Sequence, residues 1–223
     1  MVTKLQKQLL AMQDEEYRIF SQKLIKTKYP MIGIRMPLLR KFAKDATKTY
    51  QLSDFKDKYY EEVLVKAIYI ANYKCTYEEK LKLIEEFLPL VDNWAINDSF
   101  VMSLKLIKKN KESFFKEIKK YLKSNEEFTQ RFALTVLLDY YVEEDYLNDL
   151  LNIIKKEKYN GYYSLMAGAW LLSYCFISFF DETLEFVNNN KLDDFIKKKG
   201  IQKSLDSYRL SDSQKQILRA LNR

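Results

Sequence analysis

The sequence predicts an all-α protein, an α-solenoid in which antiparallel helix pairs stack on one another. Two observations favour helices: only 4 Gly and 3 Pro interrupt the 223 residues, and hydrophobic residues recur at helical spacing. A third observation argues against a sheet, because no segment alternates with a period of two for long enough to require one. The 47% hydrophobic content is ample for a core, and the length suits a single domain over residues 1–223.

The helices are expected in succession, with short connectors between them. The first helical region breaks near Gln13–Asp14, and Tyr29–Gly33 forms a turn. Pro37 suits the first turn of the next helix, where a missing N–H costs nothing, and Ser53 is expected as the N-cap of the helix that follows. The expected ranges are about 3–27, 37–50, a helix carrying Val63, Ala67 and Ile70, then 77–88, 91–108, 110–123, 126–141, 143–156, 160–179, 181–188, 191–199 and 211–222.

Antiparallel helix pairs that recur every 35–40 residues or so, about the length of one HEAT unit, indicate a HEAT-like stack. The units do not match letter for letter, so the prediction concerns architecture only. A compact helical bundle is the alternative fold. About eleven helices in one chain favour the solenoid, because each pair then needs only its neighbours to bury its apolar stripe.

The composition excludes several classes of site. The chain has no histidine, which removes histidine general bases, histidine metal ligands and Ser/His/Asp triads. It has no Gly-rich phosphate-binding motif, and Cys75 and Cys175 are most simply buried, reduced thiols. The longest apolar-looking segment, 167–180, is too short to span a membrane, and the N-terminus lacks the apolar run of a signal peptide. We therefore expect a soluble, cytoplasmic protein.

The positive charge is concentrated near the N-terminus. Residues 1–50 hold 11 Lys and Arg and 4 Asp and Glu, whereas residues 51–223 hold 27 of each kind. A local basic field attracts polyanions, nucleic acid first among them, although Lys-rich helices also occur simply as solvated surface. The basic side chains of this region include Lys23, Lys26, Lys28, Arg35, Arg40, Lys41, Lys44 and Lys48.

The segment VDNWAINDSF, residues 91–100, is the first candidate for chemistry. It places Trp94 and Asp98 four residues apart on a helix, so that both side chains project from one face. An aromatic ring beside a carboxylate can hold a cationic ring and stabilise developing positive charge. The alternatives are a core tryptophan and a carboxylate that pairs with a lysine.

Two further candidates lie downstream. Arg131 stands beside the apolar stripe of the 126–141 helix, where it is either a cation directed along a concave edge or a surface charge. Trp170 follows Gly168 and Ala169, and small residues there let a neighbouring backbone or a ligand approach the indole.

In this order and at these separations, VDNWAINDSF, the Arg of FTQRFALTVLL and the Trp of MAGAWLLSYCF resemble the AlkD-type DNA alkylation repair glycosylases. The early GIRMPLLRKFAK and the late IQKSLDSYRLSDSQKQIL add to the resemblance, which covers about residues 10–220. It implies a curved α-solenoid of HEAT-like helix pairs with a basic concave face for duplex DNA. It also implies a monomer that excises cationic N3- or N7-alkylated purines without metal or organic cofactor.

The resemblance carries the family's site onto four residues of this chain: Trp94, Asp98, Arg131 and Trp170. Asp98 would stabilise the oxocarbenium-like sugar and position the attacking water, as in other glycosidic hydrolyses. The two tryptophans would pack on the deoxyribose and backbone, and Arg131 would bind a phosphate. The residues expected to bind DNA are Arg35, Arg40, Lys41, Lys44, Lys105 and Lys108.

Two N-terminal positions differ from the family pattern. Leu24 stands where we align a tyrosine, and Arg35 where we align a glutamine that faces the lesion strand. These differences motivate the alternative hypothesis of a non-catalytic module of the same family that binds damaged or branched DNA, or a protein partner.

Overall fold

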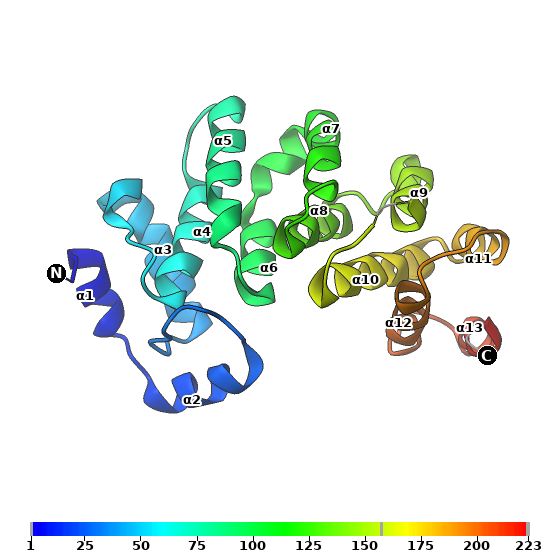
Figure 1. The fold of residues 1–223 in the computed structure, drawn as a ribbon, viewed down its shortest axis with the longest axis horizontal. Helices are drawn as coiled ribbons and strands as arrows, with labels where there is room; N and C mark the ends of the chain where they lie inside the picture. Colours follow the sequence, from blue (N-terminus) through cyan, green and yellow to red (C-terminus); the bar gives the residue numbers. More distant parts are fainter. Residues whose placement is uncertain (1, 157, 222–223) are drawn as a thin grey trace. The chain divides into compact units, whose positions relative to one another are not determined.

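The computed structural model describes residues 2–156 and 158–221, which form thirteen α-helices and no strand (Figure 1). The predicted all-α fold is confirmed, with helices packed in pairs as in a solenoid of helical repeats. The first six helices are α1 (Lys4–Leu10), α2 (Glu15–Leu24), α3 (Met36–Thr49), α4 (Tyr60–Asn72), α5 (Tyr77–Phe87) and α6 (Trp94–Ser103). The others are α7 (Lys111–Leu122), α8 (Glu127–Tyr140), α9 (Leu147–Lys156), α10 (Tyr162–Ser178), α11 (Phe180–Asn189), α12 (Asp194–Leu205) and α13 (Asp212–Leu221).

The helices form two compact units, Met1–Lys109 and Asn110–Arg223. Each unit is described by itself below. The single domain expected over residues 1–223 stays a prediction.

Helix α4 is the centre of the first unit, where it packs against α3 and α6. Its apolar side chains are buried on all sides rather than along one stripe, as expected for a core helix. Two carboxylates, Glu61 and Glu62, are buried within its first turn. Buried charges are tolerated only with hydrogen-bonding partners, so these two side chains must hold other parts of the chain against α4.

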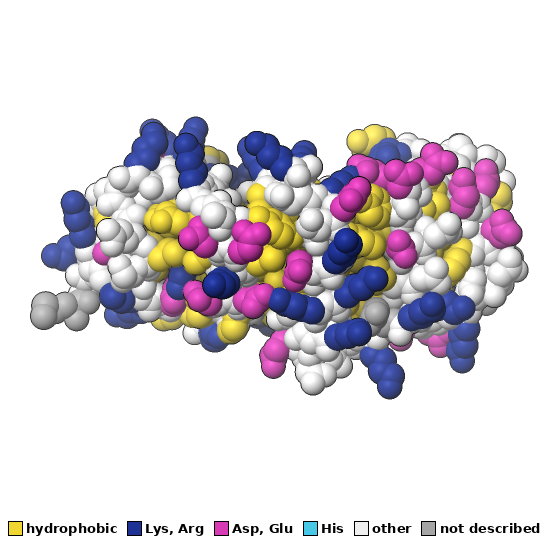
Figure 2. All heavy atoms as spheres, turned by 90° about the horizontal axis from the view of Figure 1, so that it is seen from above, with side chains coloured by type: hydrophobic (Ala, Val, Ile, Leu, Met, Phe, Trp, Pro, Cys, Tyr) yellow, Lys and Arg dark blue, Asp and Glu magenta, His cyan; other side chains and the backbone are white. Residues whose placement is uncertain are grey.

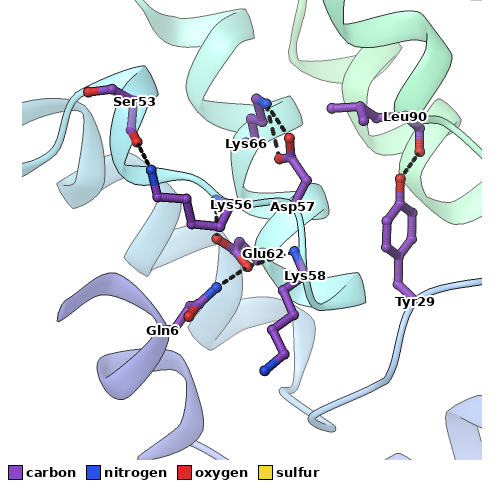
Figure 3. Close-up of polar contacts among 9 residues, drawn as sticks. All are labelled: Gln6, Tyr29, Ser53, Lys56, Asp57, Lys58, Glu62, Lys66 and Leu90. Carbon is purple, nitrogen blue, oxygen red and sulfur yellow. Dashed lines mark hydrogen bonds and ion pairs between the residues drawn. The ribbon is translucent and has the colours of Figure 1, made fainter. Parts of the chain in front are cut away.

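Glu62 holds two separate segments, helix α1 and the connection before α4 (Figure 3). Its carboxylate accepts hydrogen bonds from the Gln6 side chain on α1 at 2.9 Å, and from the backbone N–H groups of Lys56 at 2.7 Å and Lys58 at 3.0 Å. Beside it, the Lys66 ammonium forms an ion pair with Asp57 at 2.8 Å. The connection before α4 is therefore fixed by side chains of α4 itself.

Glu61 holds the connection between α2 and α3. Its carboxylate accepts hydrogen bonds from the backbone N–H groups of Ile32 at 2.8 Å and Gly33 at 2.7 Å. Burial raises the pKa of the Glu61 carboxyl, and the backbone donors partly oppose this rise. Gly33 in turn accepts from the backbone N–H of Asp14 at 2.7 Å, so the start of α2 is connected to α4 through this loop.

We expect Gly33→Ala to lower the free energy of unfolding by about 2–3 kcal/mol, from left-handed strain and overpacking together. Gly33 has φ +87°, and an added Cβ would lie 2.4 Å from the Asp14 carbonyl oxygen. Urea denaturation of both proteins measures the loss. Gly168→Ala is the matched control, since its Cβ would meet side-chain atoms alone, Ile196 at 3.1 Å and Tyr159 at 3.8 Å. Equal losses in the two variants would contradict this account of Gly33.

Helix α10 is the centre of the second unit, where it packs against α8 and α12. A Cβ at Gly200 of α12 would lie 2.8 Å from the Leu172 side chain and 3.2 Å from the Ala169 carbonyl oxygen. The absence of a side chain at Gly200 therefore allows α12 to approach the α10 backbone closely. The small residues before Trp170 thus face the neighbouring helix, as Gly168 faces Ile196.

Several details of the sequence prediction are wrong. Ser53 does not cap a helix: it lies in the short 3₁₀ turn Leu52–Asp54. Helix α4 begins only at Tyr60, because Glu62 binds the backbone N–H groups of Lys56 and Lys58 and holds this segment in a non-helical conformation. The helix expected to end at residue 199 continues through Gly200, since packing against α10 outweighs the low helix propensity of glycine. Cys75 is partly exposed, in the loop after α4, whereas Cys175 is buried and reduced as expected.

The helix expected over 91–108 is also shorter than predicted. It is α6 followed by the 3₁₀ turn Lys105–Lys109, because Leu104 leaves the helical conformation at ψ +58° to bury its side chain. None of the helices in the described part of the chain is long and apolar enough to cross a membrane. On the face shown in Figure 2, basic side chains are interspersed with acidic ones, with strips of hydrophobic side chains between them.

Candidate functional site

Helix α6 presents Trp94 and Asp98 on one face, as the spacing predicted. Trp94 is the first residue of the helix and is 38% exposed, an unusual position for an indole that is merely part of the core. Asp98 is half-buried, and the side-chain amide of the fully buried Asn97 donates to its Oδ1 at 2.9 Å. The carboxylate therefore has a fixed orientation next to an accessible aromatic ring.

The start of α6 is fixed by two polar side chains. Asn93 is the N-cap, and its Oδ1 accepts from the backbone N–H groups of Ala95 at 3.0 Å and Ile96 at 3.1 Å. Its amide donates to Asp92 Oδ1 at 2.7 Å. Trp94 thus follows two residues whose side chains are both held by hydrogen bonds.

Asp92 connects this helix start to the segment that leads away from α2. Its carboxylate accepts from the Thr27 hydroxyl at 2.8 Å and from the Lys28 backbone N–H at 2.6 Å. The Tyr29 hydroxyl donates to the Leu90 carbonyl at 2.9 Å (Figure 3). Burial, with the nearby Asp92 charge, raises the pKa of Tyr29 to about 12, so this hydroxyl keeps its proton at neutral pH. The basic N-terminal region and the Trp94 helix are therefore joined directly.

Arg131 is buried rather than on the surface. It lies in the second turn of α8, is 5% exposed, and its Nη1 donates to the Tyr163 carbonyl oxygen at 3.0 Å. One turn earlier on the same face, Glu127 accepts from the Tyr163 backbone N–H. Gly161, at φ +86°, leaves room for the Glu127 carboxylate, which a Cβ would meet at 2.4 Å. The two charged side chains of α8 thus hold the first turn of α10.

Trp170 lies on α10, two helical turns beyond Tyr163, a rise of ~10 Å. It is half-buried and lines a cavity of about 370 Å³ in the second unit. The Lys203 ammonium lies over its ring, 5.6 Å from the ring centroid. The structure therefore places Arg131 and Trp170 in the second unit, and Trp94 and Asp98 in the first.

The side chains expected to bind DNA are all exposed, but they differ in their surroundings. Arg40, Lys41 and Lys44 lie on α3, and Lys105 and Lys108 lie in the 3₁₀ turn after α6. Arg35 is already engaged: it forms an ion pair with Asp14 at 2.8 Å and lies over the Tyr17 ring at 5.4 Å. The Tyr17 backbone N–H, and then the Arg35 guanidinium, hold the pKa of the Asp14 carboxyl below its usual value.

Sequence reasoning missed several residues that position these groups. Asp92 and Lys203 were assigned no role, and their partners lie at long sequence separations that no local pattern reveals. A signal was present for the turn after α12, where Tyr208 and Arg209 stand in a short Ser- and Asp-containing connection between helices. Within the described residues, no group of three Cys, Asp or Glu side chains could hold a metal ion.

Comparison with protein-family models gives a match. The sequence model of a family described as "DNA alkylation repair enzyme" matches residues 5–203. No curated protein matches the chain. The matched range covers most of the chain, includes Trp94, Asp98, Arg131 and Trp170, and ends at Lys203, within α12.

Proposed function

The chain belongs to the DNA alkylation repair enzyme family, and from this premise we propose that it is a monofunctional DNA glycosylase. Its substrate is duplex DNA with a cationic N3- or N7-alkylated purine, and the reaction is hydrolysis of the N-glycosidic bond. One observation carries this proposal above others. The Asp98 carboxylate is held by Asn97 on the same helix face as the accessible Trp94 ring.

The chemistry needs little beyond a well-placed carboxylate. The alkylated base already carries a positive charge, so the electrons of the breaking C1′–N bond neutralise it and it departs without an added proton. The deoxyribose left behind has oxocarbenium character, which the Asp98 carboxylate stabilises. Water then attacks C1′ and gives up a proton, for which Asp98 is the acceptor. The products are the neutral base and an abasic site.

The other three residues bind and orient DNA in this proposal. Trp94 packs on the deoxyribose beside the lesion and attracts the cationic base, a contact worth about 0.5–2 kcal/mol. Trp170 provides a second aromatic surface, which packs against the DNA backbone. Arg131 binds a phosphate by a charge-assisted hydrogen bond, in addition to its hydrogen bond to the Tyr163 carbonyl oxygen.

A specific observation favours the alternative of a non-catalytic DNA-binding module. Leu24, at the end of α2, is 56% exposed and has no polar group to offer a DNA strand. Arg35 is already paired with Asp14 and stacked on Tyr17. A chain of this kind would bind DNA through α3 and neighbouring lysines without base loss.

Release of 7-methylguanine and 3-methyladenine from methylated duplex DNA tests the proposal. We expect free base to appear with time in the presence of the wild-type protein and to exceed spontaneous depurination. DNA binding that weakens steeply with salt, but without base release, would support the alternative and overturn the glycosylase. Binding that is absent or insensitive to salt would overturn both and indicate a protein scaffold.

A further inference from the structure

The cavity beside Trp170 has the composition of a nucleotide site. It measures about 370 Å³, within the range of small-ligand pockets. Its aromatic walls are Trp170, Tyr174 and Tyr208, and its two cations are Lys203 and Arg209. An aromatic base and a phosphate are the two chemical groups that such a lining complements.

The inner wall consists of side chains from two packed helices, α10 and α12. Trp170 and Tyr174 lie one turn apart on α10, with ring centroids 6.3 Å apart and an interplanar angle of 77°. Lys203 follows Gly200 by one turn of α12, and the close approach of Gly200 to α10 brings the Lys203 ammonium over the Trp170 ring. The cation is therefore positioned by the packing of the two helices and not by a surface loop.

The outer wall is the turn between α12 and α13, and it projects an aromatic side chain into solvent. The Ser207 backbone N–H donates to the Ser204 carbonyl at 3.1 Å, and the Ser207 hydroxyl accepts from the Arg209 backbone N–H at 3.2 Å. The buried Leu210 anchors the end of the turn. Tyr208, at the tip of this turn, is nevertheless 94% exposed. An ordered turn with an exposed ring offers a stacking surface.

This turn also lies beyond the residues that the family model matches, which end at Lys203. The segment 201–218 adds to the resemblance noted above, but Tyr208 and Arg209 are not among the matched residues. Asp206 adds a further restriction, because a carboxylate at the rim weakens the binding of a simple anion. It favours a ligand that carries both an anion and hydrogen-bond donors, as a phosphate joined to a nucleobase does.

We propose that this cavity binds a single unpaired nucleotide of a DNA strand. The base stacks on Tyr208 against the wall formed by Trp170, and its phosphate lies between Lys203 and Arg209. This inference rests on the proposed function only in taking DNA as the ligand. It adds that the second unit recognises locally unpaired DNA, so that the protein prefers a duplex with one extrahelical nucleotide over a fully paired duplex.

Fluorescence with a duplex that carries one unpaired 2-aminopurine tests this proposal. We expect the wild-type protein to quench the 2-aminopurine by stacking, and to bind this duplex about 10-fold more tightly than its fully paired counterpart. Tyr208→Ala should remove both effects, whereas Tyr208→Phe should keep them. Arg209→Ala should weaken binding and reduce the salt dependence by about one ion. Arg219→Ala, an exposed change on α13, is the matched control.

Equal affinity for the two duplexes, or an unchanged preference in Tyr208→Ala, would overturn the proposal. Saturable binding of free dAMP without any preference among duplexes would also overturn it and indicate a site for a soluble nucleotide. Base excision is measured separately, on fully paired methylated duplex. If excision fails while the preference and its dependence on Tyr208 remain, the glycosylase is wrong and the nucleotide site stands.

Discussion

We expect Asp98→Asn to lower the rate of 7-methylguanine release by a factor of about 100 or more, equivalent to at least ~2.7 kcal/mol of transition-state stabilisation. The substitution preserves the shape of the side chain and its contact with Asn97, but it removes the negative charge opposite the developing oxocarbenium ion. Single-turnover kinetics on methylated duplex DNA measure the chemical step directly, because the rate of product release does not contribute to them.

Two controls test whether the loss of rate is specific to the charge of Asp98. Binding of undamaged duplex and the thermal unfolding temperature should remain close to those of the wild type, because Asp98 is only half-buried and the change is isosteric. Asp149→Asn, the same chemical change at an exposed position, should leave the rate unaltered. Equal rates for wild type and Asp98→Asn would show that Asp98 does not have the assigned role.

Glu62→Ala should have the largest effect on stability, a loss of about 3–5 kcal/mol. It removes the shared acceptor of three donors that come from Gln6, Lys56 and Lys58, all of which would be left near α4 without this partner. For a chain of this length the loss corresponds to a decrease in Tm of about 10 °C or more. Calorimetry or circular dichroism at 222 nm measures it.

Glu86→Ala is the matched control, because Glu86 is an exposed glutamate on the neighbouring helix α5. Its effect should stay within about 0.5 kcal/mol. Glu62→Gln should fall between the two, since it keeps one accepting oxygen while losing the charge. If Glu62→Ala is no worse than Glu86→Ala, the carboxylate does not hold these segments together.

Much of the secondary structure follows from local pattern. Hydrophobic spacing is enough to locate α8 and α10 within about two residues of their ends, and Pro37 marks the first turn of α3. The errors arise where distant parts of the chain intervene. Ser53 has the chemistry of an N-cap, but Glu62 fixes the backbone after it; Gly200 would end an isolated helix, but contact with Leu172 favours its continuation.

The candidate site likewise has features that follow from local spacing and features that depend on distant parts of the chain. The shared face of Trp94 and Asp98 is a property of spacing on one helix, and the structure reproduces it. The burial of Arg131 is not predictable from its neighbours in sequence, because it depends on the carbonyl of Tyr163 in another helix. Lys203 lies over Trp170 only because Gly200 sets the approach of two helices, which no local sequence pattern encodes.

The Asp92 carboxylate connects the segment after α2 to the start of α6. It accepts hydrogen bonds from Thr27 and Lys28 and from Asn93, the N-cap of α6, so the segment after α2 and the helix that carries Trp94 share one hydrogen-bond acceptor. In the proposed glycosylase, DNA binding by the N-terminal region and base release at Trp94 and Asp98 would therefore both depend on Asp92. We expect a substitution at Thr27, which is not one of the four assigned site residues, to change the rate of base release as well as the affinity for DNA.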